Sequence, residues 1–119
     1  MTQQHFFYRN DGLLKRINLD EILFLETADN YTRIHLRDGF HVVRIPMKLA
    51  LEKLDNKRFV QVHRSYVVAV DKMDTIAREF IILATDQKIQ VPFSRKYLPN
   101  LLKQIEIMGP GVELEEEGD

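Results

Sequence analysis

Hydrophobic and polar residues alternate with a period of two through most of the chain, and turn-forming dipeptides interrupt the alternation at short intervals. Because successive side chains of a strand point to opposite faces, this pattern predicts many short β-strands and a mostly β core. Asp-Gly at 11–12 and at 38–39 favours two hairpin turns. In chain order the predicted strands are Phe6–Arg9, Leu13–Ile17, Ile22–Leu25, Tyr31–Leu36, Phe40–Arg44, two within Phe59–Val70, Thr75–Arg78, Phe80–Ala84 and Lys88–Val91.

Two segments instead favour helices. The apolar residues of Met47–Leu54 recur on one helical face, directly after a proline, so we expect a short helix that covers the sheet. Ser94 is a predicted N-cap for a second helix. Pro99 lacks a backbone donor, so this helix is expected to break, to restart with Pro99 near its first position and to run to about Ile105.

The distribution of charge divides the chain into a body and a tail. All 17 Lys and Arg residues lie at or before Lys103, together with 12 of the 18 acidic residues, so residues 1–105 carry a net charge of +5. A body of this charge can attract a polyanion. We expect one domain over residues 1–105 and a flexible acidic tail over 106–119.

Composition excludes several classes of protein. The chain has no cysteine, which rules out disulfides and thiolate zinc sites. It has no apolar stretch of the roughly 18 to 20 residues that a membrane-spanning helix needs and no secretory signal pattern, so the expected location is the cytoplasm. His35 and His41 lack metal-ligand spacing and are predicted to face each other across a hairpin as solvent-facing residues. We expect neither a metal nor a cofactor.

Three polar residues, His63, Arg64 and Ser65, interrupt an otherwise apolar stretch. Ser65 with His63 could suggest a hydrolase, but no glycine-framed elbow surrounds the serine, so we expect no enzyme. His63 is predicted to be a partly buried imidazole that ties a loop to the sheet and orders Arg64. The Arg64 guanidinium offers bidentate recognition of guanine edges or phosphates.

Two further segments carry candidate binding residues. Arg95 and Lys96 follow Ser94 at a predicted helix N-terminus, where the helix dipole disfavours cations, so they suit an external anion or form a solvated charge pair. Asn30 has a side-chain amide that can read adenine, although beside Asp29 it is equally a simple turn residue.

Together these segments resemble a known family. The resemblance is carried by Ile22–Glu26 followed by Asn30-Tyr31, by Phe59–Val68, which contains His-Arg-Ser-Tyr, and by Val91–Tyr97, which contains Pro-Phe-Ser-Arg. Over about residues 6–105 the chain resembles the LytTR-type DNA-binding domain found at the C-terminus of many bacterial response regulators. The resemblance implies an elongated, mostly β fold of about ten strands, in a sheet or barrel arrangement with one short helix mid-chain and one C-terminal helix.

In such domains loops, rather than a recognition helix, enter the major groove of double-stranded DNA. The resemblance implies that Asn30, Arg64 and Arg95 read bases. It implies that DNA backbone contact and positioning fall to Arg33, His63, Ser65, Tyr66, Ser94 and Lys96. The chain departs from the family at Ala69, where asparagine is frequent, and at Gln61, where a cation is common.

The resemblance also implies a working state. Two protomers bind imperfect direct repeats, as output domains of a two-component transcription regulator whose longer parent protein can carry a receiver domain. One alternative stays open on the residues alone, namely a small β-barrel module that binds a protein or peptide through an exposed strand edge.

Overall fold

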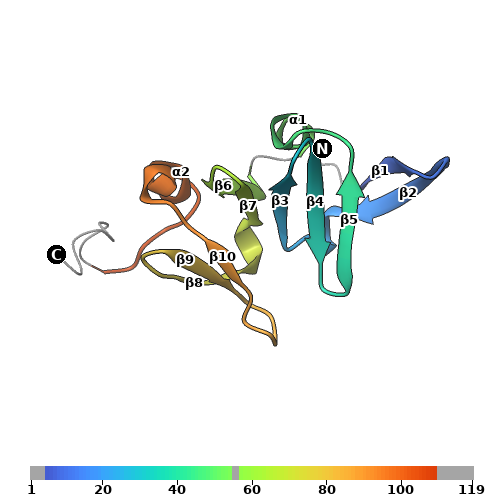
Figure 1. Ribbon diagram of the computed structural model, residues 1–119. Coiled ribbons are helices and arrows are strands. Elements are labelled where there is room, and N and C mark those ends of the chain that lie inside the picture. The colour runs from blue at the N-terminus through green and yellow to red at the C-terminus, as the bar shows by residue number, and fades with distance from the viewer. Residues whose placement is uncertain (1–4, 55–56, 110–119) are drawn as a thin grey trace.

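Ten strands form the framework of the molecule over residues 5–54 and 57–109, which are the residues that the computed structural model describes. The strands form three antiparallel sheets that lie in a row and give the molecule an elongated shape (Figure 1). This architecture confirms the predicted mostly β fold, and the sheets are open rather than closed into a barrel. No helix within those ranges is long and apolar enough to cross a membrane.

The first sheet is the hairpin of β1 (His5–Asn10) and β2 (Leu13–Asn18). Its two turn residues, Asp11 and Gly12, have φ angles of 54° and 80°. Two consecutive left-handed residues are what a tight hairpin needs to match the twist of its strands, so the predicted Asp-Gly turn is confirmed.

The central sheet has five strands in the order β5-β4-β3-β7-β6. Their bounds are β3 (Phe24–Ala28), β4 (Tyr31–Leu36), β5 (Gly39–Val43), β6 (Phe59–His63) and β7 (Tyr66–Ala69). Strand β3 therefore pairs with β4 on one side and with β7, about forty positions later in the chain, on the other. This long-range pairing brings together segments that are distant in sequence.

The third sheet has the order β10-β9-β8, and the remaining elements are short helices. Its strands are β8 (Met73–Ile76), β9 (Phe80–Leu83) and β10 (Gln90–Pro92). The helices are α1 (Met47–Lys53), α2 (Leu98–Leu102) and the single 3₁₀ turns Leu19–Glu21, Val70–Lys72 and Arg95–Tyr97. The predicted mid-chain helix is confirmed.

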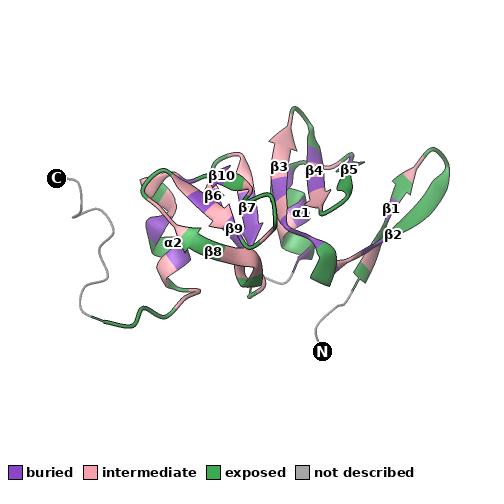
Figure 2. Ribbon diagram, turned by 90° about the horizontal axis from the view of Figure 1, so that it is seen from below, coloured by how far each residue is buried: buried purple, intermediate pink, exposed green. Residues whose placement is uncertain are grey.

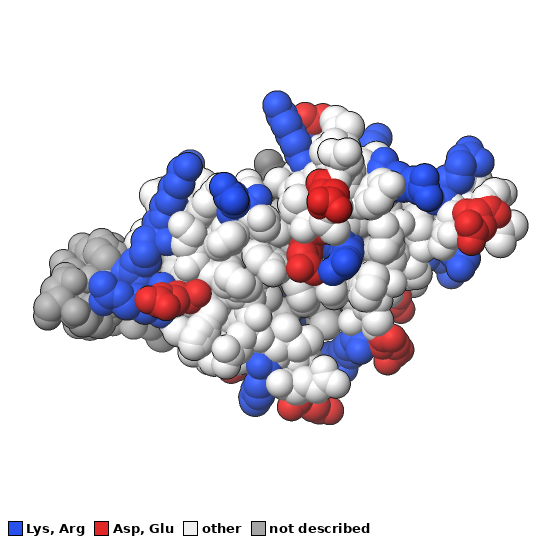
Figure 3. All heavy atoms as spheres, viewed as in Figure 1, with Lys and Arg blue, Asp and Glu red and all other residues white. Residues whose placement is uncertain are grey.

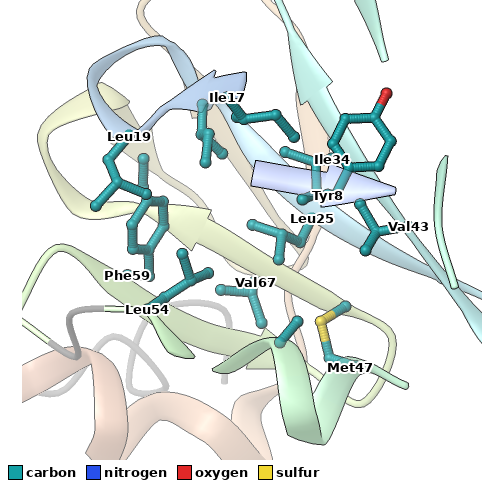
Figure 4. Close-up of a cluster of buried hydrophobic side chains, with 13 residues drawn as sticks. Tyr8, Ile17, Leu19, Leu25, Ile34, Val43, Met47, Leu54, Phe59 and Val67 are labelled. Atoms are coloured by element: carbon teal, nitrogen blue, oxygen red, sulfur yellow. The ribbon is translucent and has the colours of Figure 1, made fainter. Parts of the chain in front are cut away.

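Two hydrophobic cores lie on opposite faces of the central sheet (Figure 2). The period-two alternation of β7 sends Val67 into the first core and Val68 into the second, and neither side chain is exposed. Met47 of helix α1 and Leu54, the residue after the helix, close the first core, as Figure 4 shows. The second core lies between the central sheet, the third sheet and α2.

The C-terminal helix differs from the prediction. Ser94 has an extended backbone, with φ −104° and ψ 130°, but its side chain makes no capping hydrogen bond. The chain then makes a 3₁₀ turn, and α2 begins at Leu98 with Pro99 next to its start, so the predicted break is confirmed. The helix ends at Leu102, before Ile105, because a turn-type bond from the Gln104 N–H to the Leu101 carbonyl, at 2.9 Å, closes it.

The predicted pairing of His35 with His41 is wrong. Leu36 pairs with Gly39, so the two turn residues are Arg37 and Asp38, one residue earlier than the Asp-Gly dipeptide suggested. His35 therefore lies opposite Phe40, and His41 lies opposite Ile34. A shift of one residue in a hairpin places the two histidines on opposite faces. Of the predicted acidic tail, only residues 106–109 fall within the described part of the chain.

Candidate nucleic-acid interface

Two turns of the central sheet emerge at the same end because β3 runs antiparallel to both of its neighbours. Ala28 pairs with Tyr31 across the β3–β4 turn, and Glu26 pairs with Tyr66, the first residue of β7. A backbone hydrogen bond of 2.9 Å from the Thr27 N–H to the Ser65 carbonyl joins the two turns directly. They lie at the upper end of the sheet in Figure 1, where the arrow of β3 points.

The segment after β10 reaches the same end by a different route. The buried ring of Phe93 fixes this segment in the second core, and the Ser94 N–H donates to the Val62 carbonyl at 2.9 Å. Val62 lies in β6, three residues before Ser65. The 3₁₀ turn that carries Arg95 and Lys96 therefore starts beside the β6–β7 turn.

The candidate base-reading residues differ in exposure. Asn30 and Arg64 are exposed and Arg95 is half-buried. In the β3–β4 turn the left-handed residue is Asp29, with a φ of 57°, so the backbone does not require an asparagine at position 30. A left-handed backbone therefore does not explain the asparagine at position 30, and its side-chain amide is open to solvent.

The β6–β7 turn is held by hydrogen bonds within the protein. The Ser65 N–H donates to Nδ1 of His63 at 3.1 Å, and the Gln61 amide donates to the His63 carbonyl at 3.2 Å. The His63 ring also packs edge-on against Tyr66, with 5.4 Å between centroids. The prediction that His63 ties this loop to the sheet is confirmed, and Gln61 stabilises the turn although it departs from the family pattern.

These hydrogen bonds do not arrange His63 and Ser65 for nucleophilic catalysis. The contact between His63 and Ser65 uses the backbone N–H of the serine rather than its hydroxyl, so the imidazole does not activate that oxygen. Within residues 5–54 and 57–109, no group of three or more His, Asp or Glu side chains is arranged to hold a metal ion.

Behind the turns, the Glu26 carboxylate forms the centre of a polar network. It accepts a bond of 2.9 Å from Nε2 of His35 and lies 3.7 Å from a guanidinium nitrogen of Arg33. The Tyr66 hydroxyl donates to it at 3.4 Å. Arg33 and Tyr66 are thus directed toward Glu26, and His35 is stacked on Phe24 with 4.1 Å between ring centroids.

The network also determines the charge state of Tyr66. Burial raises the pKa of its hydroxyl above the usual value, and the neighbouring Glu26 carboxylate raises this pKa further, while Arg33 opposes them. Tyr66 therefore stays neutral at physiological pH and remains a hydrogen-bond donor. Its contact with Glu26 couples β7 to β3 directly beneath the two joined turns.

Charged side chains on this end are of mixed sign, with a basic excess. Figure 3 shows Lys and Arg side chains along the upper margin of the molecule, interrupted by a few acidic ones. Lys96 is exposed and lies 6.0 Å from the ring centroid of Tyr97, whereas Arg33 is paired with Glu26. The cations open to an external anion are thus on the turns rather than within the sheet.

Sequence reasoning did not find two features of this end. The Glu26 network was missed, although an acid inside an apolar strand is a signal that a partner is needed. Arg44 was also missed as a candidate. It lies just after β5, at the same end of the sheet, with its guanidinium carbon 5.6 Å from the ring centroid of Tyr31.

Comparison with known proteins identifies the domain. Residues 13–106 match the model of the LytTr DNA-binding domain, which is most of the chain and includes all three turns. The chain belongs to the LytTr DNA-binding domain family. The matched region starts at the first residue of β2, so β1 lies outside it. The domain is therefore a DNA-binding domain and does not belong to an enzyme class.

Two individual proteins support the assignment. An uncharacterized response regulatory protein of Vibrio cholerae is 32% identical over 85 residues, which cover 66% of this chain and 33% of that protein, so the match spans about a third of that relative. The second is the LytTr DNA-binding domain of a Bacillus cereus protein described as a methyl-accepting/DNA response regulator. It superposes with a TM-score of 0.70 at 18% identity and covers 86% of this chain and 96% of that domain, which shows a shared fold.

Proposed function

We propose that this LytTr domain recognises a specific double-stranded DNA sequence by placing its three turns in the major groove. The proposal is carried by one observation. Two backbone hydrogen bonds, from Thr27 to Ser65 and from Ser94 to Val62, hold three sequence-distant turns at one end of the molecule. Exposed side chains on a fixed backbone, such as Asn30 and Arg64, suit the reading of base edges, which needs donors and acceptors at set spacing.

Each turn contributes one base-reading side chain in this proposal. Arg64 and Arg95 each offer two parallel N–H donors to the O6 and N7 atoms of guanine, and the Asn30 amide matches the N6 and N7 atoms of adenine. Arg64 is the best placed, because the turn beneath it is held by His63 and its guanidinium is exposed.

The remaining residues divide into two groups by their contacts. Lys96 and Ser94 lie where they can meet phosphates, since the first is exposed and the second is half-buried at the start of the 3₁₀ turn. Arg33 and Tyr66 act through Glu26, and His63 and Ser65 act through the turn backbone. These four residues hold the base-reading side chains in position rather than orienting the DNA.

In the cell we infer that the domain is the output domain of a cytoplasmic two-component transcription regulator. The Vibrio cholerae relative, a response regulatory protein about three times as long as the matched segment, supports this inference. Two protomers would bind imperfect direct repeats, with a receiver domain in a longer parent protein.

The decisive experiment is selection of genomic DNA fragments by the purified domain at near-physiological salt, repeated with Arg64→Ala and Arg95→Ala. We expect an enriched direct repeat whose motif loses information at different positions in each variant, with a cost of about 1–3 kcal/mol per base contact. Arg37→Ala is the matched control, because Arg37 is an exposed arginine in the turn at the opposite end of the sheet. Equal losses on selected and random DNA for Arg64→Ala would remove this residue from base reading.

A second function is favoured by one observation, namely that no strand of the described residues pairs with the outer side of β5, although Tyr8 of β1 contacts His41 there. Strand β5 is the outermost strand, and its Phe40 and Val42 side chains are 52% and 41% exposed. An extended peptide can add to such an edge. Salt separates the two functions, since DNA binding releases counterions and weakens steeply with salt, whereas strand addition responds weakly.

A further inference from the structure

We propose that Arg44, stacked on Tyr31, is a fourth DNA contact that binds a phosphate on the flank of the β3–β4 turn. This inference rests on the proposed function and extends its contact surface to the end of β5. The three turns would read bases, and Arg44 would fix the outer edge of the domain on the DNA backbone.

The strand register places Arg44 beside the turn that carries Asn30. Thr32 pairs with Val43, the last residue of β5. Arg44, the first residue after β5, therefore lies opposite Tyr31, which directly follows Asn30 in the chain. The upward arrow of β5 in Figure 1 ends at the same edge as that of β3. Arg44 thus leaves the sheet at the end where the three turns lie.

The contact with Tyr31 orients the guanidinium without using its donors. The guanidinium carbon lies 5.6 Å from the ring centroid, and both side chains are exposed, Tyr31 by 39%. A guanidinium held over an aromatic ring is attracted by the ring electrons and does not use its N–H donors, which stay available for a phosphate. Holding the side chain in this way lowers the entropy that is lost when a phosphate binds.

Hydrogen bonds on the residue after Arg44 fix its backbone as well. The Thr32 hydroxyl donates to the Ile45 carbonyl at 2.8 Å, and the Ile45 N–H donates to the Val43 carbonyl at 2.9 Å. Thr32 is the one fully buried polar side chain in the described part of the chain. A buried hydroxyl with a single partner is a strong constraint, so the backbone around Arg44 is as well anchored as the β6–β7 turn.

Charge distinguishes Arg44 from the neighbouring Arg33. Arg33 lies on the same face of the sheet, two residues after Tyr31 in β4, but it pairs with Glu26 and lies over the Phe40 ring. Arg44, in contrast, forms no ion pair with a carboxylate of residues 5–54 and 57–109. A phosphate would therefore meet no competing carboxylate bound to Arg44.

The test compares Arg44→Gln with Arg37→Gln on two duplexes, the DNA motif enriched by the wild-type domain and a random sequence of equal length. Arg44→Gln should weaken binding to both duplexes by a similar factor of about three to ten and reduce the slope of log affinity against log salt by about one, as expected for one phosphate. Arg37→Gln should change neither. Tyr31→Ala should cost less in the Arg44→Gln background than in the wild type, because the two side chains act as a unit.

The outcomes separate this inference from the proposed function. If Arg64→Ala and Arg95→Ala lose specific binding while Arg44→Gln behaves like Arg37→Gln, the proposed function stands and the Arg44 contact is wrong. A loss confined to the selected motif would also overturn it, because a phosphate contact carries no base preference. If the wild-type domain selects no motif and binds DNA without salt dependence, both proposals fail.

Discussion

The buried hydroxyl of Thr32 allows a sharp test of how this end of the domain is held. Thr32→Val keeps the shape of the side chain and removes its bond to the Ile45 carbonyl. Leaving a buried acceptor unpaired costs about 1–3 kcal/mol, which is an upper range here because Ile45 is only partly buried. The methyl group that replaces the hydroxyl returns up to about 0.8 kcal/mol through burial of apolar surface. The expected net loss in the free energy of unfolding is therefore up to about 2 kcal/mol.

Urea denaturation followed by circular dichroism measures this loss, with the m-value expected to stay unchanged because the fold is the same. For a domain of this size each kcal/mol corresponds to roughly 4–8 °C in Tm. Thr27→Val is the matched control, because Thr27 lies directly opposite Thr32 in β3 and is only partly buried, so we expect at most about 0.5 kcal/mol. If the two variants lose equal stability, the bond to Ile45 does not anchor the chain after β5.

Three further variants test the core, the charge network and the turn. Leu25→Ala, at a side chain with no exposure in the first core, should cost about 2–5 kcal/mol in urea denaturation, and a loss below 1 kcal/mol would contradict the assigned packing. Since the folded state raises the pKa of Tyr66, its contribution to stability is present below the unfolded pKa of about 10 and is lost as pH rises through the folded pKa. Stability should therefore fall at high pH, and Tyr66→Phe should flatten this fall. His63→Ala removes the acceptor of the Ser65 N–H, so hydrogen exchange at that amide should accelerate while core amides stay protected, and an unchanged rate would show that the imidazole does not hold the turn.

Local patterns were sufficient to predict most of the fold. The alternation in Tyr31–Leu36 predicted β4 with its observed bounds, and Asp11-Gly12 predicted a turn whose two residues both have positive φ. The His35–His41 error arose where the sequence allows two hairpin registers that differ by one residue. The His35–His41 pairing failed because the hairpin register moved by one residue, and such shifts are decided by core packing across the sheet rather than by the turn dipeptide.

The candidate site was less accessible to sequence reasoning. Residues alone left Asn30 and Arg95 undecided between structure and binding, and the family resemblance made them candidates. The bonds that join the turns run between backbone atoms of Thr27, Ser65, Ser94 and Val62, and no side-chain pattern encodes them. Arg44 was not a candidate because its proposed role depends on its position opposite Tyr31, which only the strand register reveals.

Under the proposed function, the way the turns are held would explain how a small β domain recognises a specific DNA sequence without a recognition helix. A helix presents side chains at fixed spacing because its own backbone bonds make it rigid. Here the equivalent rigidity comes from pairing between turns, with Thr27 bonded to Ser65 and Ser94 to Val62. Each bond spans segments at least thirty residues apart, so the spacing between the readers depends on the whole central sheet. Loss of sheet packing should therefore lower specificity before it lowers the attraction between phosphates and cations, which needs charge but little geometry.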